Sequence, residues 1–215
     1  MNKKKYLFVD LDGSLIKSDL LYESFARFFN QDFLAPIKCF FILLKEGIVY
    51  LKYFLAKKSS IEIANLPFNQ KVLDFISNWK ESNNGEIILI SASNHSFVES
   101  ISTHLGIFDK SYGTEKVNLK SEVKLDLIQK HTNGEPFDYI GNSRDDLIIW
   151  QSSETPILVN PSIYINNKVT LFEKDPVYIQ NRSNLLKEAL KLMRVHQWLK
   201  NMLLFLPIIL AASFS

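Results

Sequence analysis

Two aspartates stand two positions apart directly after a short apolar run near the amino terminus. The run is residues 6–9 (YLFV), and residues 10–14 (DLDGS) follow it. At such a place Asp10 can attack an electrophile covalently, as in aspartyl-phosphate chemistry, while Asp12 serves as general acid and then as base. Two acids so close together also need a cation, and oxygen ligands favour Mg²⁺. The alternative is a D-x-D-G turn that caps a helix.

A second polar stretch follows the apolar run of residues 86–90 (EIILI). Ser91 and Ala92 stand there, where a hydroxyl and backbone N–H groups at the start of a helix can hold a phosphate oxygen. The alternative is an ordinary helix N-cap, for which Ser91, Ser93 or Asn94 would all serve.

A lysine occupies an unfavourable position in the next predicted helix. Lys124 falls in its first turn, and Ser121 is the expected N-cap. A cation there opposes the helix macrodipole by roughly 0.3–1 kcal/mol, so its presence makes sense if it neutralises a phosphate. A solvated lysine is the alternative, and Lys120 competes for the role.

Residues 141–146 (GNSRDD) follow a third apolar run and end in two more acids. Asp145 and Asp146 fall in the first turn of a predicted helix, where the dipole favours acids without any further role. The spacing of the histidines is not that of metal ligands. We therefore expect structural or exposed positions for His95, His104 and His131.

The composition is that of a globular protein with a sizeable core. Among 215 residues 47% are hydrophobic and 22% are charged, which excludes intrinsic disorder and coiled-coil rods. The 25 Lys and Arg residues nearly balance 23 Asp and Glu residues, so no nucleic-acid partner is expected. A single cysteine, Cys39, excludes an internal disulfide framework and favours a reducing cytosolic environment.

Strand-like runs alternate with helix-like stretches between residues 6 and 160. This alternation predicts an α/β fold, with a parallel sheet covered on both faces and ligands at the carboxyl ends of the strands. The predicted strands are 6–9, 86–90, 137–140 and 155–159, and the predicted helices are 69–83, 95–105, 121–131 and 144–152. Each polar cluster described above follows one of these strands or opens one of these helices.

Two segments are unusually apolar. Residues 20–65 show no strand pattern and predict a helical insertion that covers the site; their apolar part, 33–56, either packs as a cap or lies on a bilayer surface. Residues 198–214 end the chain with about 13 uncharged positions after Asn201, against the ~20 that a spanning helix needs. This end resembles a membrane helix that has been cut short. The basic residues before it place the preceding domain at the cytoplasmic face of the membrane.

Four motifs in order resemble those of the haloacid dehalogenase-like phosphohydrolases: V-D-L-D-G-S, L-I-S, Lys124 and G-N-S-R-D-D. The resemblance covers residues 6–160 and implies a Rossmann-like parallel sheet with a helical cap. It implies that Asp10 is the nucleophile, and that Asp12 is the acid and base and also gives Mg²⁺ a backbone oxygen. Ser91, Ala92 and Lys124 would hold the transferring phosphoryl group.

The same resemblance implies a metal site with one departure from the family pattern. Many members have Gly-Asp where this chain has Gly141-Asn142, so a direct carboxylate ligand is replaced by an amide. The implied Mg²⁺ ligands are therefore Asp10, Asp12, Asn142, Asp145 and Asp146. Because this substitution would weaken the metal site, the alternative function is a catalytically weak module that binds a phosphorylated lipid or positions a membrane enzyme.

Residues 194–207 (RVHQWLKNMLLFLP) resemble the opening of a UbiA-type prenyltransferase membrane domain. The implied organisation is a phosphohydrolase domain over 1–180, with a cap at about 20–65, followed by a linker helix and a truncated first transmembrane helix over 181–215. The expected activity is a Mg²⁺-dependent phosphatase. Its partners would be a phosphorylated small molecule or an isoprenoid-linked sugar phosphate, and the membrane through the C-terminal helix. The prenyltransferase part is incomplete.

Overall fold

A six-stranded parallel sheet organises the chain in the computed structural model, which describes residues 5–59 and 61–180. The strand order is β3-β2-β1-β4-β5-β6, so β1 lies between β2 and β4 and is buried along its whole length. The strands are β1 (Tyr6–Asp10), β2 (Glu86–Asn94), β3 (Lys110–Thr114), β4 (Asp138–Gly141), β5 (Pro156–Val159) and β6 (Val177–Ile179). The predicted parallel α/β sheet is confirmed.

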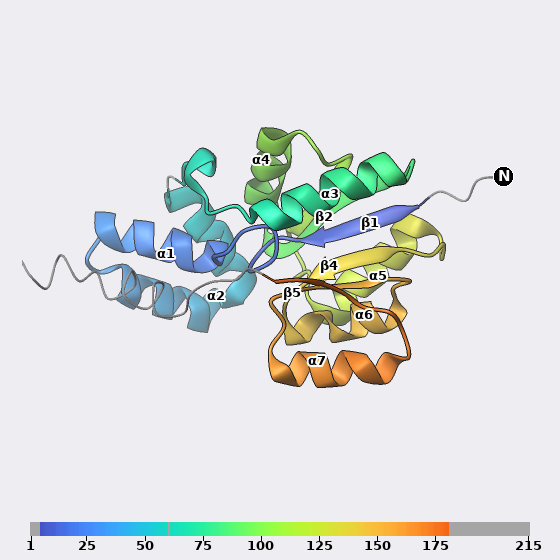
Figure 1. Cartoon of the computed structure of the whole chain (residues 1–215). Coiled ribbons are helices and arrows are strands. Elements are labelled where there is room, and N and C mark those ends of the chain that lie inside the picture. The colour runs from blue at the N-terminus through green and yellow to red at the C-terminus, as the bar shows by residue number, and fades with distance from the viewer. Residues whose placement is uncertain (1–4, 60, 181–215) are drawn as a thin grey trace, which may run out of the picture. The chain divides into compact units, whose positions relative to one another are not determined.

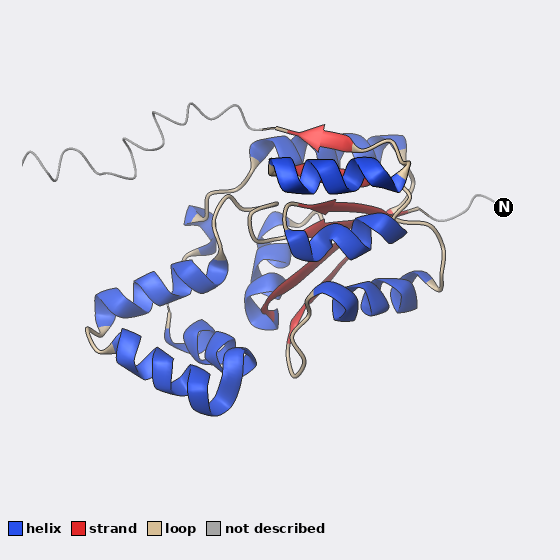
Figure 2. Cartoon of the chain, turned by 90° about the horizontal axis from the view of Figure 1, so that it is seen from below, coloured by secondary structure: helices blue, strands red, loops and turns tan. Residues whose placement is uncertain are grey.

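Helices cover both faces of this sheet (Figures 1 and 2). Leu7 and Val9 of β1 pack with α3 and α4 on one face, whereas Phe8 packs with α5, α6 and α7 on the other. This alternation is the period-two pattern of a strand buried on both sides. The helices are α3 (Gln70–Ser82), α4 (His95–Leu105), α5 (Ser121–Thr132), α6 (Leu147–Ser152) and α7 (Ile163–Val169), with short 3₁₀ turns η1 (Ile63–Asn65), η2 (Arg144–Asp146) and η3 (Thr170–Phe172).

After β1 the chain forms a helical cap, in the region 20–65 where a helical insertion is predicted. It consists of α1 (Leu20–Gln31) and α2 (Ala35–Lys58), which pack on each other around a small apolar core that includes Phe28 and Leu55. Gly47 interrupts α2 with φ 79°, a left-handed conformation that glycine adopts readily, so the helix is kinked there. Cys39 is buried in this cap core, as expected for a packed apolar side chain.

Some predictions concern residues outside the described ranges. The linker helix and truncated membrane helix expected over 181–215 lie outside the described residues. Within residues 5–59 and 61–180, none of the helices combines the length and apolar character that crossing a bilayer requires.

Candidate active site

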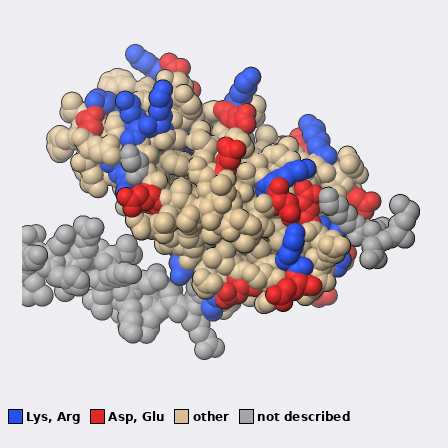
Figure 3. Space-filling model, turned by 90° about the horizontal axis from the view of Figure 1, so that it is seen from above, with Lys and Arg blue, Asp and Glu red and all other residues tan. Residues whose placement is uncertain are grey.

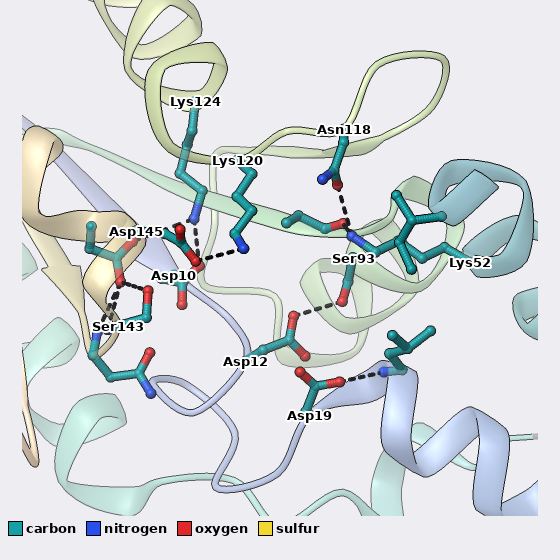
Figure 4. Close-up of a pocket in the computed structure, with 15 residues that line it drawn as sticks. Asp10, Asp12, Asp19, Lys52, Ser93, Asn118, Lys120, Lys124, Ser143 and Asp145 are labelled. Carbon is teal, nitrogen blue, oxygen red and sulfur yellow. Dashed lines mark hydrogen bonds and ion pairs between the residues drawn. The ribbon is translucent and has the colours of Figure 1, made fainter. Parts of the chain in front are cut away.

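A cavity of about 320 Å³ opens at the carboxyl ends of the central strands, beneath the cap. Figure 4 shows side chains from both parts of the fold pointing into it. The strand ends and the loops after them supply Asp10, Asp12, Ser93, Asn142 and Asp145, among others. Helix α5 supplies Lys124, and the residue before this helix is Lys120. The cap supplies Leu21, Ile48 and Lys52. The polar clusters predicted from separate strand ends therefore converge on one cavity.

A buried ion pair lies at the floor of the cavity. Lys124 Nζ donates to Asp10 Oδ1 at 2.7 Å and lies 3.7 Å from Asp146 Oδ1. Lys124 is 4% exposed, so the alternative of a solvated lysine is wrong. Since buried charges need partners, the two carboxylates explain why a lysine is held here.

Burial dominates the protonation equilibria of this pair. It raises the pKa of Asp10 to about 7, although the nearby Lys124 cation acts in the opposite direction. Burial alone would lower the pKa of Lys124, but the carboxylates of Asp10 and Asp146 together raise it. Lys124 is therefore protonated, and the carboxyl group of Asp10 loses its proton near neutral pH.

The start of α5 positions Lys124 differently from the prediction. The N-cap is Lys120 rather than Ser121, because Ser121 has φ 48° and its hydroxyl donates to Asp145 Oδ1 at 3.2 Å instead of capping the helix. Lys120, the competitor for the phosphate-binding role, pairs with Asp145 Oδ2 at 2.9 Å. Of these two lysines, Lys124 is the one that contacts Asp10.

Asp12 is held by hydroxyls from β2 and by the start of the cap. Its Oδ2 accepts from Ser93 Oγ at 2.6 Å and Ser91 Oγ at 2.9 Å, and its Oδ1 accepts from the backbone N–H of Leu20 at 2.8 Å. Burial raises the pKa of Asp12 although these hydrogen bonds oppose it. A raised pKa favours the protonated acid that a leaving group needs.

Ser91 and Ala92 lie within β2, which runs on to Asn94 instead of ending at Ile90. Asn94 is the N-cap of α4, because its side chain accepts from the N–H of Ser96, so the N-cap alternative for Ser91 is wrong. The Ser91 hydroxyl is fully buried and donates to Asp12. Ala92 lines the cavity and its carbonyl accepts from Lys52.

Gly13 and Asn142 fit closely together beside Asp10. Gly13 has φ 76°, and a Cβ built on it would lie 2.1 Å from Asn142 Nδ2, so a larger residue has no room. Ser14 Oγ lies 3.4 Å from both Asp10 Oδ2 and Asn142 Oδ1. A carboxylate oxygen and an amide oxygen therefore face one hydroxyl, and both are ligand types that Mg²⁺ accepts. This pair fits Mg²⁺ with one carboxylate instead of two.

The two later acids of the fourth motif have other partners. Asp146 is 1% exposed; its Oδ2 accepts from the N–H and hydroxyl of Ser143 and from the N–H of Asn142, and its Oδ1 accepts from Tyr139 Oη at 2.6 Å. Asp145 pairs with Lys120. Among the described residues, no group of three or more His, Cys, Asp or Glu side chains is placed to hold a metal ion. Asp146 thus fixes the loop through Ser143 and faces Lys124, and its role as a metal ligand stays a prediction.

Several residues of the site were missed by the sequence analysis. Lys52 of the cap donates to Ala92 O at 2.6 Å and to Asn118 Oδ1 at 2.8 Å, and burial lowers its pKa. Ser93 shares Asp12 with Ser91, and a period-two strand pattern would have placed both hydroxyls on one side. Lys52 has no such signal, because its position depends on how the cap packs.

Comparison with known proteins supports the fold. No family model matches the chain. The uncharacterized protein y4nM of Sinorhizobium fredii is 36% identical over 214 residues, or 97% of this chain, and the chain spans 40% of the length of that relative.

Two solved structures illustrate the similarity. A phosphoserine phosphatase in its apo form superposes with a TM-score of 0.58 at 18% identity and covers 88% of this chain and 98% of its own. A haloacid dehalogenase-like hydrolase from Streptococcus pneumoniae gives 0.56 at 16%, covering 88% and 99%. The chain therefore shares its overall fold with these two solved structures.

Proposed function

We propose that the protein is a phosphatase that hydrolyses a phosphomonoester through an aspartyl-phosphate intermediate. The observation that carries this proposal is the buried contact between Asp10 and Lys124, with Asp12, two residues further along, lining the same cavity. The fold shared with solved phosphatases supports it.

In the first step, Asp10 attacks the phosphorus atom while the bond from phosphorus to the leaving oxygen breaks. Asp12 gives its proton to that oxygen, so the product leaves as an alcohol. Lys124 balances the negative charge that gathers on the phosphoryl oxygens. Burial of Asp12, which raises its pKa, keeps the proton available for this step.

In the second step, water attacks the phosphorus of the aspartyl phosphate. Asp12, now deprotonated, accepts the proton of the water, and inorganic phosphate leaves as the Asp10 carboxylate is restored. Asp10, Asn142 and the main-chain oxygen of Asp12 would hold Mg²⁺. When bound, the ion supplies further charge neutralisation at the phosphoryl oxygens.

The direct test is phosphate release from p-nitrophenyl phosphate, with Mg²⁺ and with a chelator, by the wild type and by Asp10→Asn. Asp126→Asn is the matched control, because Asp126 is an exposed acid on the same helix as Lys124. Metal-dependent release that only Asp10→Asn abolishes is the expected result. Equal release by wild type and Asp10→Asn would overturn the proposal.

A second candidate function is a binding module without turnover. The amide of Asn142, where many related motifs have a carboxylate, favours it. A folded wild-type protein that binds phosphate but releases none from any ester would support this module over the phosphatase.

For the substrate we propose an isoprenoid-linked sugar phosphate, presented at the cytoplasmic face of a membrane. The resemblance of residues 194–207 to the opening of a UbiA-type prenyltransferase supports this choice. Phosphate release from isoprenoid-linked and free sugar phosphates, compared side by side, tests it: equal kcat/KM for the two would count against a lipid-linked substrate.

A further inference from the structure

The cap exposes an apolar face on the first half of α2. Ile37, Phe40, Phe41 and Leu44 repeat at positions i, i+3, i+4 and i+7, and they are between 54% and 66% exposed. The opposite side of the same helix packs Ala35 and Cys39 into the cap core. We call the four exposed residues, with Phe33 just before the helix, the apolar cap face.

Lysines outnumber acids along the helix that carries this face. From residue 33 to 58 the sequence has five lysines and one acid, Glu46. Lys52 turns into the active-site cavity, whereas Lys38, Lys45, Lys57 and Lys58 are exposed. Figure 3 shows several Lys and Arg side chains, with fewer Asp and Glu side chains among them, over the cap end of the molecule. Lys38 pairs with Asp32, so the remaining three carry most of the unbalanced charge.

The sign of this charge distinguishes the occupants that an apolar face can have. A second copy would bring the same lysines against themselves. Residues 181–215 of the chain are also basic, with five Lys and Arg residues and one Glu. An anionic lipid surface complements both features, because it takes up aromatic and aliphatic side chains and attracts the lysines beside them.

We propose that the apolar cap face docks the domain onto an anionic lipid bilayer, with Phe40 and Phe41 entering the headgroup region. The second half of α2 supplies Ile48 and Lys52 to the cavity wall. One helix therefore both binds the membrane and borders the site. Docking does not depend on turnover, so Asp10→Asn binds vesicles as the wild type does and the two proposals fail separately.

The test places a fluorescent reporter in the face. Phe40→Trp in the full chain is mixed with vesicles of phosphatidylcholine, with or without phosphatidylglycerol, that contain brominated acyl chains. Leu171→Trp is the matched control, because Leu171 is 71% exposed and lies outside the cap. The native tryptophans are common to both proteins. In anionic vesicles, we expect bromine to quench the fluorescence of Phe40→Trp more than that of Leu171→Trp.

The charge is tested in the Phe40→Trp background. Lys45→Gln and Lys57→Gln each raise the half-saturating lipid concentration for quenching about fivefold, whereas Lys168→Gln, an exposed lysine of α7, does not. Equal quenching of Phe40→Trp and Leu171→Trp would overturn the proposal. So would a lipid-free dimer, seen by analytical ultracentrifugation, that Phe40→Glu dissociates.

Discussion

Lys124 Nζ lies between two buried carboxylates, 2.7 Å from Asp10 Oδ1 and 3.7 Å from Asp146 Oδ1. Tyr139 Oη adds a further oxygen 3.1 Å from the ammonium group and itself donates to Asp146. Four residues from β1, α5, β4 and η2 are thereby joined in one buried network.

Removal of the central cation should destabilise the fold. Lys124→Met leaves Asp10 and Asp146 buried without their counter-charge, and we expect the free energy of unfolding to fall by about 3–5 kcal/mol. Lys120→Met is the control: it removes a half-exposed lysine paired with Asp145 and should cost less than about 1 kcal/mol. Urea unfolding of both variants at neutral pH measures the difference. Equal losses would show that the buried network contributes nothing special.

The raised pKa of Asp10 predicts that stability depends on pH. Its folded-state pKa is about 7 against an ordinary 3.8, so between these values the folded chain keeps a proton that the unfolded chain has lost. Stability from this group therefore falls as pH rises from 3.8 to 7, by roughly 1 kcal/mol per pH unit, and then levels off.

Asp10→Asn removes this titration. As pH rises from 4 to 7 in the presence of a chelator, the melting temperature of Asp10→Asn should rise relative to that of the wild type. Asp126→Asn should run parallel to the wild type. A constant gap between Asp10→Asn and wild type would contradict the raised pKa of Asp10.

Asn142→Asp should strengthen Mg²⁺ binding. The substitution adds a carboxylate where an amide oxygen now faces Ser14 and Asp10, and one further charge beside the ion is worth about tenfold or more in affinity. Asn118→Asp adds the same charge on the Lys52 side of the cavity and is the control. Mg²⁺-dependent thermal shifts measure both. Similar titration curves for the two variants would argue against Asn142 as a ligand.

Asp12→Asn should slow the reaction in a way that depends on the leaving group. Loss of the acid lowers kcat/KM by about 10²–10⁴ for an alkyl phosphate, whose alkoxide needs a proton to leave. p-Nitrophenolate leaves without a proton, so kcat/KM for p-nitrophenyl phosphate should fall much less. Ser100→Ala, in the exposed part of α4, serves as the control. Equal losses for both esters would remove Asp12 from the role of acid.

The central strands were predictable because each contains a continuous apolar run and the chain alternates strands with helices. β3 and β6 were not predicted. β3 reads KSYGT and is mostly only half-buried, and β6 has three residues of which two are exposed. Edge strands such as these carry weak hydrophobic patterns, so only their pairing with β2 and β5 identifies them.

The site was predictable where it lies on strand ends. Asp10, Asp12, Ser91 and Lys124 follow from motif order, and the structure brings them together. The partners of Asp146 were not predictable, because a carboxylate in a first helical turn looks the same whether it caps a loop or binds an ion. Lys52 depends on the packing of the cap on the sheet, which no local pattern encodes.

The position of β1 also has a consequence for biosynthesis. β1 is paired on one side with β2 and on the other with β4, whose residues follow about 130 positions later. Until β4 leaves the ribosome, the backbone N–H and C=O groups along one edge of β1 have no native partners, and such long-range pairing folds slowly and is prone to aggregation. Asp10 is thus synthesised well before the residues that surround it, and its surroundings cannot form until residue 146 has emerged.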